Sequence, residues 1–188
     1  MVEPGARVLD IGCGDGELLS LLKTTRGADA RGMELSQAGV NICVAKGLSV
    51  IQGDADTDLD GYPDRGFDYV ILSQTLQATR RPDAVIDQIT RIGRRAIVSF
   101  PNFGHWRVRL SLLAGGRMPV TRNLDEPWYL TPNIHLCTIK DFVDLCEARS
   151  IGIEQALGVV GGEVARPFSG RGTFANLLAE EAVVLLSR

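Results

Sequence analysis

The nine residues from 8 to 16, VLDIGCGDG, constrain the fold of this chain more than any other stretch. They begin as a short buried strand, and glycines then follow at alternate positions, Gly12, Gly14 and Gly16. The next seven residues, ELLSLLK, place leucines at helical spacing. A strand, a glycine turn and a helix in this order begin a nucleotide-binding α/β fold. The glycines leave no side chain between the backbone and a ligand, and they allow dihedral angles closed to other residues.

The charges of this turn indicate which nucleotide it would take. A dinucleotide fingerprint has the spacing G-x-G-x-x-G and places a pyrophosphate at the start of its helix. Here the spacing is G-x-G-x-G, and the turn carries Asp10, Asp15 and Glu17. Three carboxylates would repel a pyrophosphate, whereas they suit a ligand with a cationic end and no phosphate. S-adenosylmethionine (SAM), with its ammonium, sulfonium and adenosine, is such a ligand.

A further acidic residue, Glu34, supports a nucleoside ligand. It lies in the short apolar stretch 30–35, twenty residues after Gly14. An acidic side chain at about this distance can accept hydrogen bonds from both ribose hydroxyls. The alternative interpretation is a glycine turn in an α/β protein that binds no ligand.

These residues, together with Gly53-Asp54-Ala55, resemble the motifs of class I SAM-dependent methyltransferases. More narrowly, the chain resembles the MetW family of bacterial methionine-biosynthesis proteins. The narrower likeness rests on four long blocks, and it extends over nearly the whole chain. The blocks lie at residues 14–19, 99–106, 115–121 and 131–142.

The resemblance implies an α/β fold with a doubly wound, mostly parallel, seven-stranded Rossmann-like sheet, whose last strand is antiparallel beside the fifth. We expect one domain over residues 1–188, with an inserted loop and helical region at about 101–137. After the first strand, the apolar and turn patterns predict strands at residues 30–35, 48–52, 67–72, 95–100, 151–157 and 182–186. They predict helices at residues 17–27, 37–46, from 82 onward and 139–149.

Two polar residues are predicted to cap helices. Ser36 precedes the second helix, and Thr138 forms a capping box with Asp141. By contrast, the glycine-rich segment 159–176 is expected to be mobile.

The resemblance also assigns a site for SAM or S-adenosylhomocysteine. The residues expected to hold it are Asp10, Gly12, Cys13, Gly14, Gly16, Glu34, Leu35, Asp54, Ala55 and Ser73. Asp54 would accept a hydrogen bond from the exocyclic amine of adenine; the alternative is an ordinary turn residue. Asp56 is expected to face solvent. Related proteins usually carry a helix before the first strand that helps to cover the cofactor, and this sequence begins almost at the strand.

The region 101–137 departs from the alternation of strands and helices. It contains both tryptophans and both histidines, and residues 106–113 are predicted to form a short helix. A loop this long within a compact domain is usually functional. We expect it to sit over the methyl end of the cofactor or to present a docking surface. Trp106, Trp128 and Tyr129 would anchor the loop or, if exposed, an interface.

Composition argues against several other classes of function. The net charge is −3 and the basic residues are scattered, so nothing indicates a nucleic-acid surface. None of the four cysteines forms a C-x-x-C pair, so no zinc site is expected. Together with the lack of a signal-peptide pattern, they predict reduced thiols in a cytoplasm. No apolar run approaches membrane-spanning length, and no membrane partner is expected.

The sequence marks a methyl-acceptor site less clearly than a cofactor site. The Asn-Pro-Pro-aromatic signature of amino-group methyltransferases is absent, since residues 72–75 read Leu-Ser-Gln-Thr in its place. His105 and His135 are candidate bases because imidazole titrates near neutrality; the alternative for each is a structural role. Methyl transfer depends largely on alignment, so the lack of a catalytic triad leaves the question of catalysis open.

Two functions therefore compete. The MetW resemblance implies a cytoplasmic partner of homoserine O-acyltransferase (MetX), in which the methyltransferase fold serves as a sensor of SAM or S-adenosylhomocysteine or as a scaffold. The alternative is an active SAM-dependent methyltransferase that acts on an unidentified small molecule.

Overall fold

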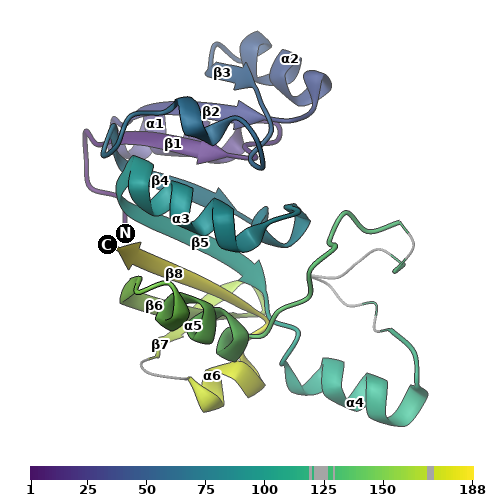
Figure 1. The fold of residues 1–188 in the computed structure, drawn as a ribbon. Helices are drawn as coiled ribbons and strands as arrows, with labels where there is room; N and C mark the ends of the chain where they lie inside the picture. Colours follow the sequence, from purple (N-terminus) through teal and green to yellow (C-terminus); the bar gives the residue numbers. More distant parts are fainter. Residues whose placement is uncertain (119, 121–126, 129, 169–171) are drawn as a thin grey trace.

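The computed structural model describes residues 1–118, 120, 127–128, 130–168 and 172–188. Within these ranges eight strands form one sheet in the order β3-β2-β1-β4-β5-β8-β6-β7 (Figure 1). The strands are β1 (Arg7–Ile11), β2 (Asp29–Glu34), β3 (Ser49–Gln52), β4 (Phe67–Ser73), β5 (Gly93–Pro101), β6 (Gly152–Val160), β7 (Glu163–Pro167) and β8 (Glu181–Ser187).

Helices connect most of these strands. They are α1 (Glu17–Arg26), α2 (Gln37–Ala45), α3 (Pro82–Ile92), α4 (Trp106–Gly115), α5 (Ile139–Ala148) and α6 (Thr173–Leu178), with short 3₁₀ turns η1 (Leu59–Gly61) and η2 (Leu76–Ala78). The predicted caps are confirmed. Ser36 accepts a hydrogen bond from Gly39 N, and Thr138 and Asp141 form both bonds of a capping box.

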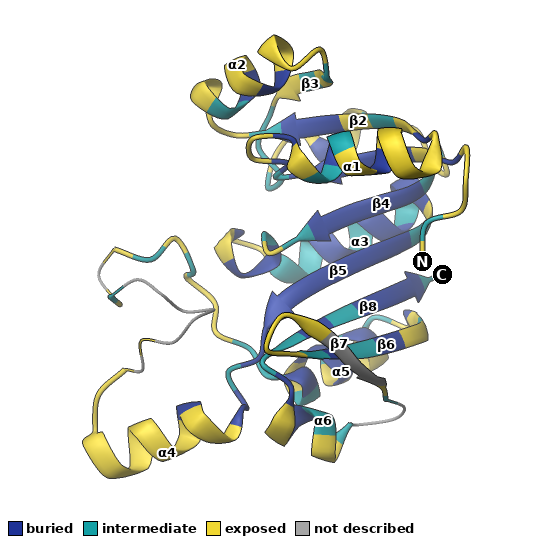
Figure 2. Cartoon of the chain, turned by 180° about the vertical axis from the view of Figure 1, so that it is seen from behind, coloured by how far each residue is buried: buried dark blue, intermediate teal, exposed yellow. Residues whose placement is uncertain are grey.

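Alternate residues of the central strands supply a core on each face of the sheet. On β1, Leu9 and Ile11 belong to the large cluster that includes the apolar faces of α3 and α5. Val8 points the other way and joins Tyr69 and Leu22, the last of which lies on α1. Accordingly α3 and α5 lie on one face in Figure 1, and α1 lies on the opposite face in Figure 2. This is the doubly wound arrangement that the sequence predicts.

The strand directions also agree with the prediction. β1 to β5 pair in parallel, and β8 runs antiparallel beside β5, with Ala96 opposite Leu186 and Pro101 opposite Glu181. All seven expected strands are present, and β7 is an additional strand on the outer edge of β6.

The described residues of the glycine-rich segment 159–176 include β7 and α6, and the expected mobility of the segment stays a prediction. Gly161 and Gly162 form a two-residue connection between β6 and β7, with φ of +62° and +86°. A Gly-Gly pair with positive φ at both positions matches the favoured hairpin turn, because its twist suits the flanking strands. The glycines therefore mark a hairpin here.

Asn102, directly after β5, joins this strand to α5 and α6. Its Oδ1 accepts hydrogen bonds from Gly104 N at 2.9 Å and Ile139 N at 3.2 Å. Its Nδ2 donates to the carbonyl oxygens of Asn176 and Ala179, both at 2.8 Å. The residue is only 2% exposed. All of its amide capacity thus serves the junction where β5 ends.

Replacing Asn102 should therefore destabilise the fold. Asn102→Ala leaves buried backbone groups unpaired, so we expect the free energy of unfolding to fall by about 2–4 kcal/mol in urea denaturation. Asn41→Ala is the matched control, because Asn41 is exposed on α2, where its side chain accepts a hydrogen bond from the exposed Gln37. Equal stability of the two variants would contradict the junction role of Asn102.

Candidate functional site

The glycine turn at residues 12–16 lies at the carboxyl end of β1 and is held against the end of β2. Gly12 N and Cys13 N both donate to the carbonyl oxygen of Met33, at 2.8 and 3.2 Å. Gly16 N donates to Cys13 O at 2.9 Å, which closes the turn before α1 begins. Because the carboxyl ends of parallel strands meet at one edge, the turn lies where open α/β sheets bind ligands.

Two glycines of this turn have different roles. Gly12 has φ of +74°, and a Cβ built on it would lie 2.4 Å from Thr75 Oγ1. Packing against the end of β4 therefore requires a glycine there. Gly14 has φ of +56°, and a Cβ built on it would meet no atom within 4 Å. The backbone at Gly14 consequently faces open space, as a close approach to a ligand requires.

Glu34 contacts the turn directly. It is the last residue of β2, and its Oε2 accepts a hydrogen bond from Gly14 N at 2.9 Å. Its Oε1 accepts from Ser36 N, also at 2.9 Å. Each carboxylate oxygen has a further lone pair, so the fixed carboxylate can still accept hydrogen bonds from a diol. Leu35, the next residue, is 63% exposed.

Asp10 is the most unusual group at this edge. It is 1% exposed, and its Oδ1 has no hydrogen-bond partner among the described residues. Burial raises the pKa of its carboxyl from 3.8 to about 7, and the negative charge of Glu34 adds to the effect. A buried acid with an unpaired oxygen, two residues before the glycine turn, fits a ligand that brings a positive charge.

Fewer carboxylates of the turn are available to a ligand than the sequence suggests. Lys46 Nζ lies 2.9 Å from Asp15 Oδ2 and donates to Asp15 O at 2.7 Å. The hydrogen bond from this lysine is the main cause of the lowered pKa of Asp15, whose side chain is 58% exposed. Glu17 is also exposed. The argument for a cationic ligand therefore depends on Asp10 and Glu34.

Two aspartates after β3, Asp54 and Asp56, hold the chain in place by accepting hydrogen bonds from backbone amides. Asp54 Oδ1 accepts a hydrogen bond from Asp56 N at 2.9 Å, which is the geometry of a turn residue. Ala55 is half-buried against the main core. The expectation that Asp56 faces solvent is wrong. It is half-buried and accepts from Arg80 N and Arg81 N at 2.9–3.0 Å, because it holds the chain before α3.

Ser73 completes the edge at the end of β4. Its hydroxyl lies 3.1 Å from the hydroxyl of Ser99 on β5, and Ser99 Oγ also accepts from Gln74 N at 3.2 Å. The order β3-β2-β1-β4 thus brings the segments that contain all ten predicted cofactor residues to neighbouring strand ends.

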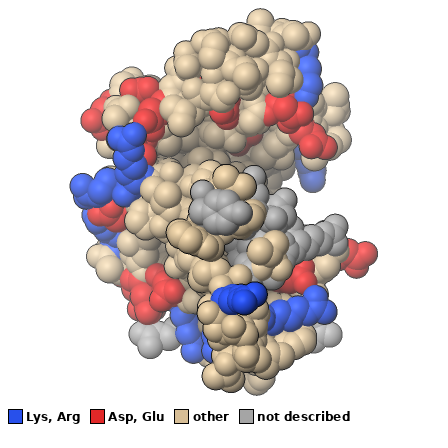
Figure 3. All heavy atoms as spheres, turned by 90° about the vertical axis from the view of Figure 1, so that its right-hand side faces the viewer, with Lys and Arg blue, Asp and Glu red and all other residues tan. Residues whose placement is uncertain are grey.

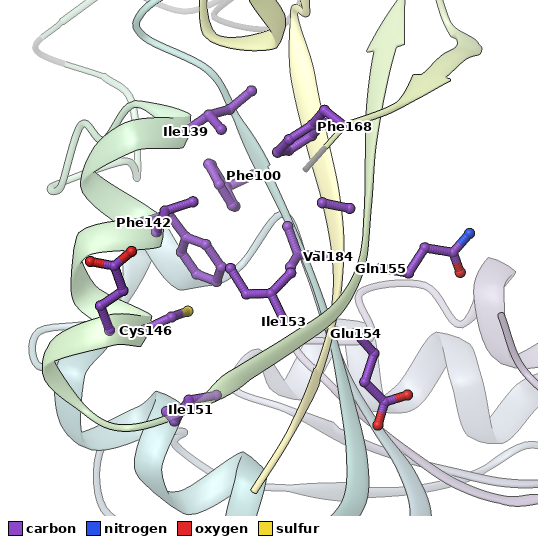
Figure 4. A pocket seen from close by; sticks show the side chains of 13 residues that line it. Phe100, Ile139, Phe142, Cys146, Ile151, Ile153, Glu154, Gln155, Phe168 and Val184 are labelled. Carbon is purple, nitrogen blue, oxygen red and sulfur yellow. The ribbon is translucent and has the colours of Figure 1, made fainter. Parts of the chain in front are cut away.

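A separate cavity of about 310 Å³ lies between α5 and strands β6 and β8 (Figure 4). Phe100 and Phe142 form part of its wall, with ring centroids 4.6 Å apart. Glu154 and Gln155 point away from its centre in Figure 4. A ligand site usually combines apolar walls with a few convergent polar groups. The glycine turn matches that description better than this cavity.

Comparison with known proteins identifies the family. A family model described as "Methionine biosynthesis protein MetW" matches residues 1–186. This chain belongs to the MetW family. A curated relative from Rhodopirellula baltica, the "Bifunctional methionine biosynthesis protein MetXA/MetW", is 32% identical over 199 residues. The match covers 100% of this chain and 31% of that protein.

Other relatives of this MetW-family chain are methyltransferases. A "Fatty-acid O-methyltransferase" from Mycolicibacterium smegmatis is 37% identical over 95 residues, which are 48% of this chain and 34% of that protein. The chain thus spans about a third of the length of these two curated relatives.

Solved structures show that the MetW-family fold is that of SAM-dependent methyltransferases. One from Thermotoga maritima, described as a possible histamine N-methyltransferase, has a TM-score of 0.69 at 16% identity and covers 99% of this chain and 83% of its own. Another from Mesorhizobium loti has a TM-score of 0.69 at 17% identity and covers 100% and 94%.

The two histidines of this MetW-family chain have structural contacts. His105 is 6% exposed and is the N-cap of α4, where its Nδ1 accepts from Arg107 N at 3.4 Å. Burial lowers its pKa, which favours the neutral form. His135 is exposed, and its Nε2 lies 3.4 Å from Arg80 O. A role of either histidine as a general base stays a prediction.

The two tryptophans of region 101–137 are exposed rather than part of the core. Trp106 is 42% exposed and Trp128 is 72% exposed. Tyr129 and part of the block 115–121 lie outside the described residues.

Other chemistry is not apparent in the described ranges. They contain no cluster of three or more His, Cys, Asp or Glu side chains that could hold a metal. Burial is the main cause that raises the pKa of Cys13, Cys137 and Cys146 to about 12, so these side chains are protonated thiols near neutral pH. None of the helices in these ranges is both long and apolar enough to cross a bilayer.

The buried Asp10 predicts a pH-dependent stability. Its folded pKa lies above its ordinary value, so the native state binds the proton more tightly and stability falls as pH rises from about 4 to 7. Asp10→Asn keeps the shape without the charge. We expect its free energy of unfolding at pH 8 to exceed that of the wild type by on the order of 2–4 kcal/mol, with little difference at pH 4.

Urea denaturation at several pH values measures this effect. Asp29→Asn is the control, because Asp29 is exposed and should leave the pH dependence unchanged. If wild type and Asp10→Asn follow the same pH dependence, Asp10 is not a buried acid of raised pKa.

Proposed function

We propose that this chain binds SAM or S-adenosylhomocysteine and acts in the cytoplasm with homoserine O-acyltransferase, MetX, in methionine biosynthesis. The observation that carries the proposal is the bifunctional relative, whose name joins MetXA and MetW in one protein. The match to it covers the full length of this chain. A fusion keeps two domains at high effective concentration. Such an arrangement suits domains that work on each other.

The glycine turn supports the cofactor assignment. We assign the ammonium of the ligand to the vicinity of Asp10, whose unpaired oxygen needs a positive charge nearby. Glu34 is fixed in place to accept the ribose hydroxyls, and the exposed backbone of Gly14 allows the ligand to approach. Asp54 uses Oδ1 within its own turn, so its Oδ2 is the oxygen that we assign to the adenine amine.

The surroundings favour binding over catalysis. The side-chain amide of Asn102 already makes four hydrogen bonds to backbone groups. Its oxygen is therefore not available to bind a substrate that would accept the methyl group. His105 is buried as a helix cap, and His135 lies beside the Arg80 carbonyl. With Asn102, His105 and His135 engaged in these contacts, the described residues suit a sensor of SAM or S-adenosylhomocysteine, or a scaffold.

The second candidate is a methyltransferase that acts on a small molecule. It is favoured by the "Fatty-acid O-methyltransferase" relative, which is 37% identical over 48% of this chain. SAM supplies an already activated methyl group, so binding and alignment of an acceptor can suffice for transfer. Turnover of SAM in a metabolite extract distinguishes this candidate from the first.

Calorimetric titration with SAM tests the site. We expect Asp10→Asn and Glu34→Ala each to weaken binding by at least about 10-fold, because each loses a charge-assisted contact. Asp15→Asn is the matched control, since Asp15 pairs with Lys46, and its affinity should stay within about 2-fold. Wild type that gives no heat, or acidic-site variants that bind as wild type does, would refute the assignment.

An acyl-transfer assay tests the partnership. Homoserine O-acyltransferase from the same organism is assayed alone, with this protein, and with this protein plus SAM. We expect a stable complex and a higher rate, and we expect the response to SAM to be lost in Asp10→Asn. The absence of both a complex and stimulation, together with SAM turnover in an extract, would favour the methyltransferase.

A further inference from the structure

Helix α4 carries an apolar stripe that the described part of the chain leaves exposed. Trp106, Leu110 and Leu113 follow one another at intervals of four and three residues, so they share one face of the helix. They are 42%, 52% and 86% exposed. We call these three side chains the α4 stripe. Figures 1 and 2 show α4 extending away from the sheet, with most of its surface exposed.

The opposite side of α4 is covered at its base. Val108 is 3% exposed there, whereas Leu112, one turn later on the same side, is 38% exposed. The helix therefore has apolar residues on two sides, and Val108 is its buried residue. A helix of this kind normally lies inside a core or against a partner.

The base of α4 is held in place. The His105 side chain caps its first turn, and Arg109 Nε donates to Gly104 O at 2.6 Å. The guanidinium carbon of Arg107 lies 5.4 Å from the centre of the Trp106 ring, a cation–π contact that restricts the indole. A pre-ordered stripe loses less conformational entropy when it binds.

The rim of the stripe is basic. Arg107, Arg109 and the following Arg117 are all exposed, and the ten residues of α4 include no acid. Arg107 lies 4.0 Å from Glu180, at the distance limit of an ion pair, and is still 66% exposed at its side chain. In Figure 3, the lower part of the side that faces the viewer is largely tan, with Lys and Arg side chains in blue beside it. A partner for this surface would offer an apolar groove with carboxylates at its rim.

We propose that the α4 stripe docks into such a groove on homoserine O-acyltransferase. The inference rests on the proposed function, and the full-length match to the bifunctional MetXA/MetW relative supports that occupant. An amphipathic helix face with anchors at i, i+4 and i+7 is a common means of recognition by a groove. A symmetric pair of copies fits less well, because an isologous contact between two stripes would oppose their arginines.

The test compares two kinds of Leu→Glu change. The double variant Leu110→Glu/Leu113→Glu places charge on the stripe, and Leu21→Glu places it on α1, where Leu21 is 54% exposed. Binding to homoserine O-acyltransferase from the same organism is measured by calorimetry. We expect the stripe variant to bind at least about 30-fold more weakly and Leu21→Glu to bind within about 2-fold of wild type. Thermal unfolding and SAM titration verify that both variants are folded.

Each contrary outcome has a distinct meaning. If wild type binds and stimulates the acyltransferase and the stripe variant does so equally well, the docking inference fails and the proposed function stands. If wild type shows neither complex nor stimulation, both fail. Self-association, or flotation with anionic vesicles, that the stripe variant abolishes without any change in acyltransferase binding would assign the stripe to a second copy or to a membrane surface.

Discussion

The hydrogen bond from Gly14 N to the Glu34 carboxylate is the contact on which the proposed site depends. It joins the glycine turn to the end of β2, and the two bonds to the Met33 carbonyl hold the same junction from the backbone side. Glu34 is also bonded to Ser36 N, so the start of α2 is positioned by the same side chain. One carboxylate thereby fixes the turn, the second strand and the second helix relative to one another.

Asp10 shows what this arrangement costs in stability. A buried acid with an unpaired oxygen opposes folding, yet it lies on the central strand β1, between strands whose apolar side chains are almost fully covered. The large cores on both faces of the sheet offset that penalty. Local conflicts of this kind are expected at functional positions, since a group suited to a ligand is seldom the one that best stabilises the free protein.

The sequence predicts the parts of the site that local patterns govern. The Gly12–Gly16 spacing, the distance to Glu34, and the caps at Ser36 and Thr138 each depend on residues close in sequence or on a repeated fold geometry. The partners of Asp15 and Asp56 lie 31 and about 24 residues away, and no local pattern marks Lys46 or the amides of Arg80 and Arg81. The β6–β7 hairpin is different, because its Gly-Gly turn is a local signal that could have predicted the hairpin.

Strand β5 connects the candidate cofactor edge with the base of α4. Ser99 lies beside Ser73 at the candidate cofactor edge, and Asn102, three residues later, holds Gly104 just before α4 begins. Buried Gln77 adds a second connection, since its side chain donates to Gln74 O and its carbonyl accepts from Ile134 N and His135 N. The candidate cofactor edge and the start of α4 are therefore linked through β5 and its hydrogen bonds. In such an arrangement, any influence of a bound nucleoside on a docked partner must be matched by an equal influence of the partner on the nucleoside, because linkage is reciprocal.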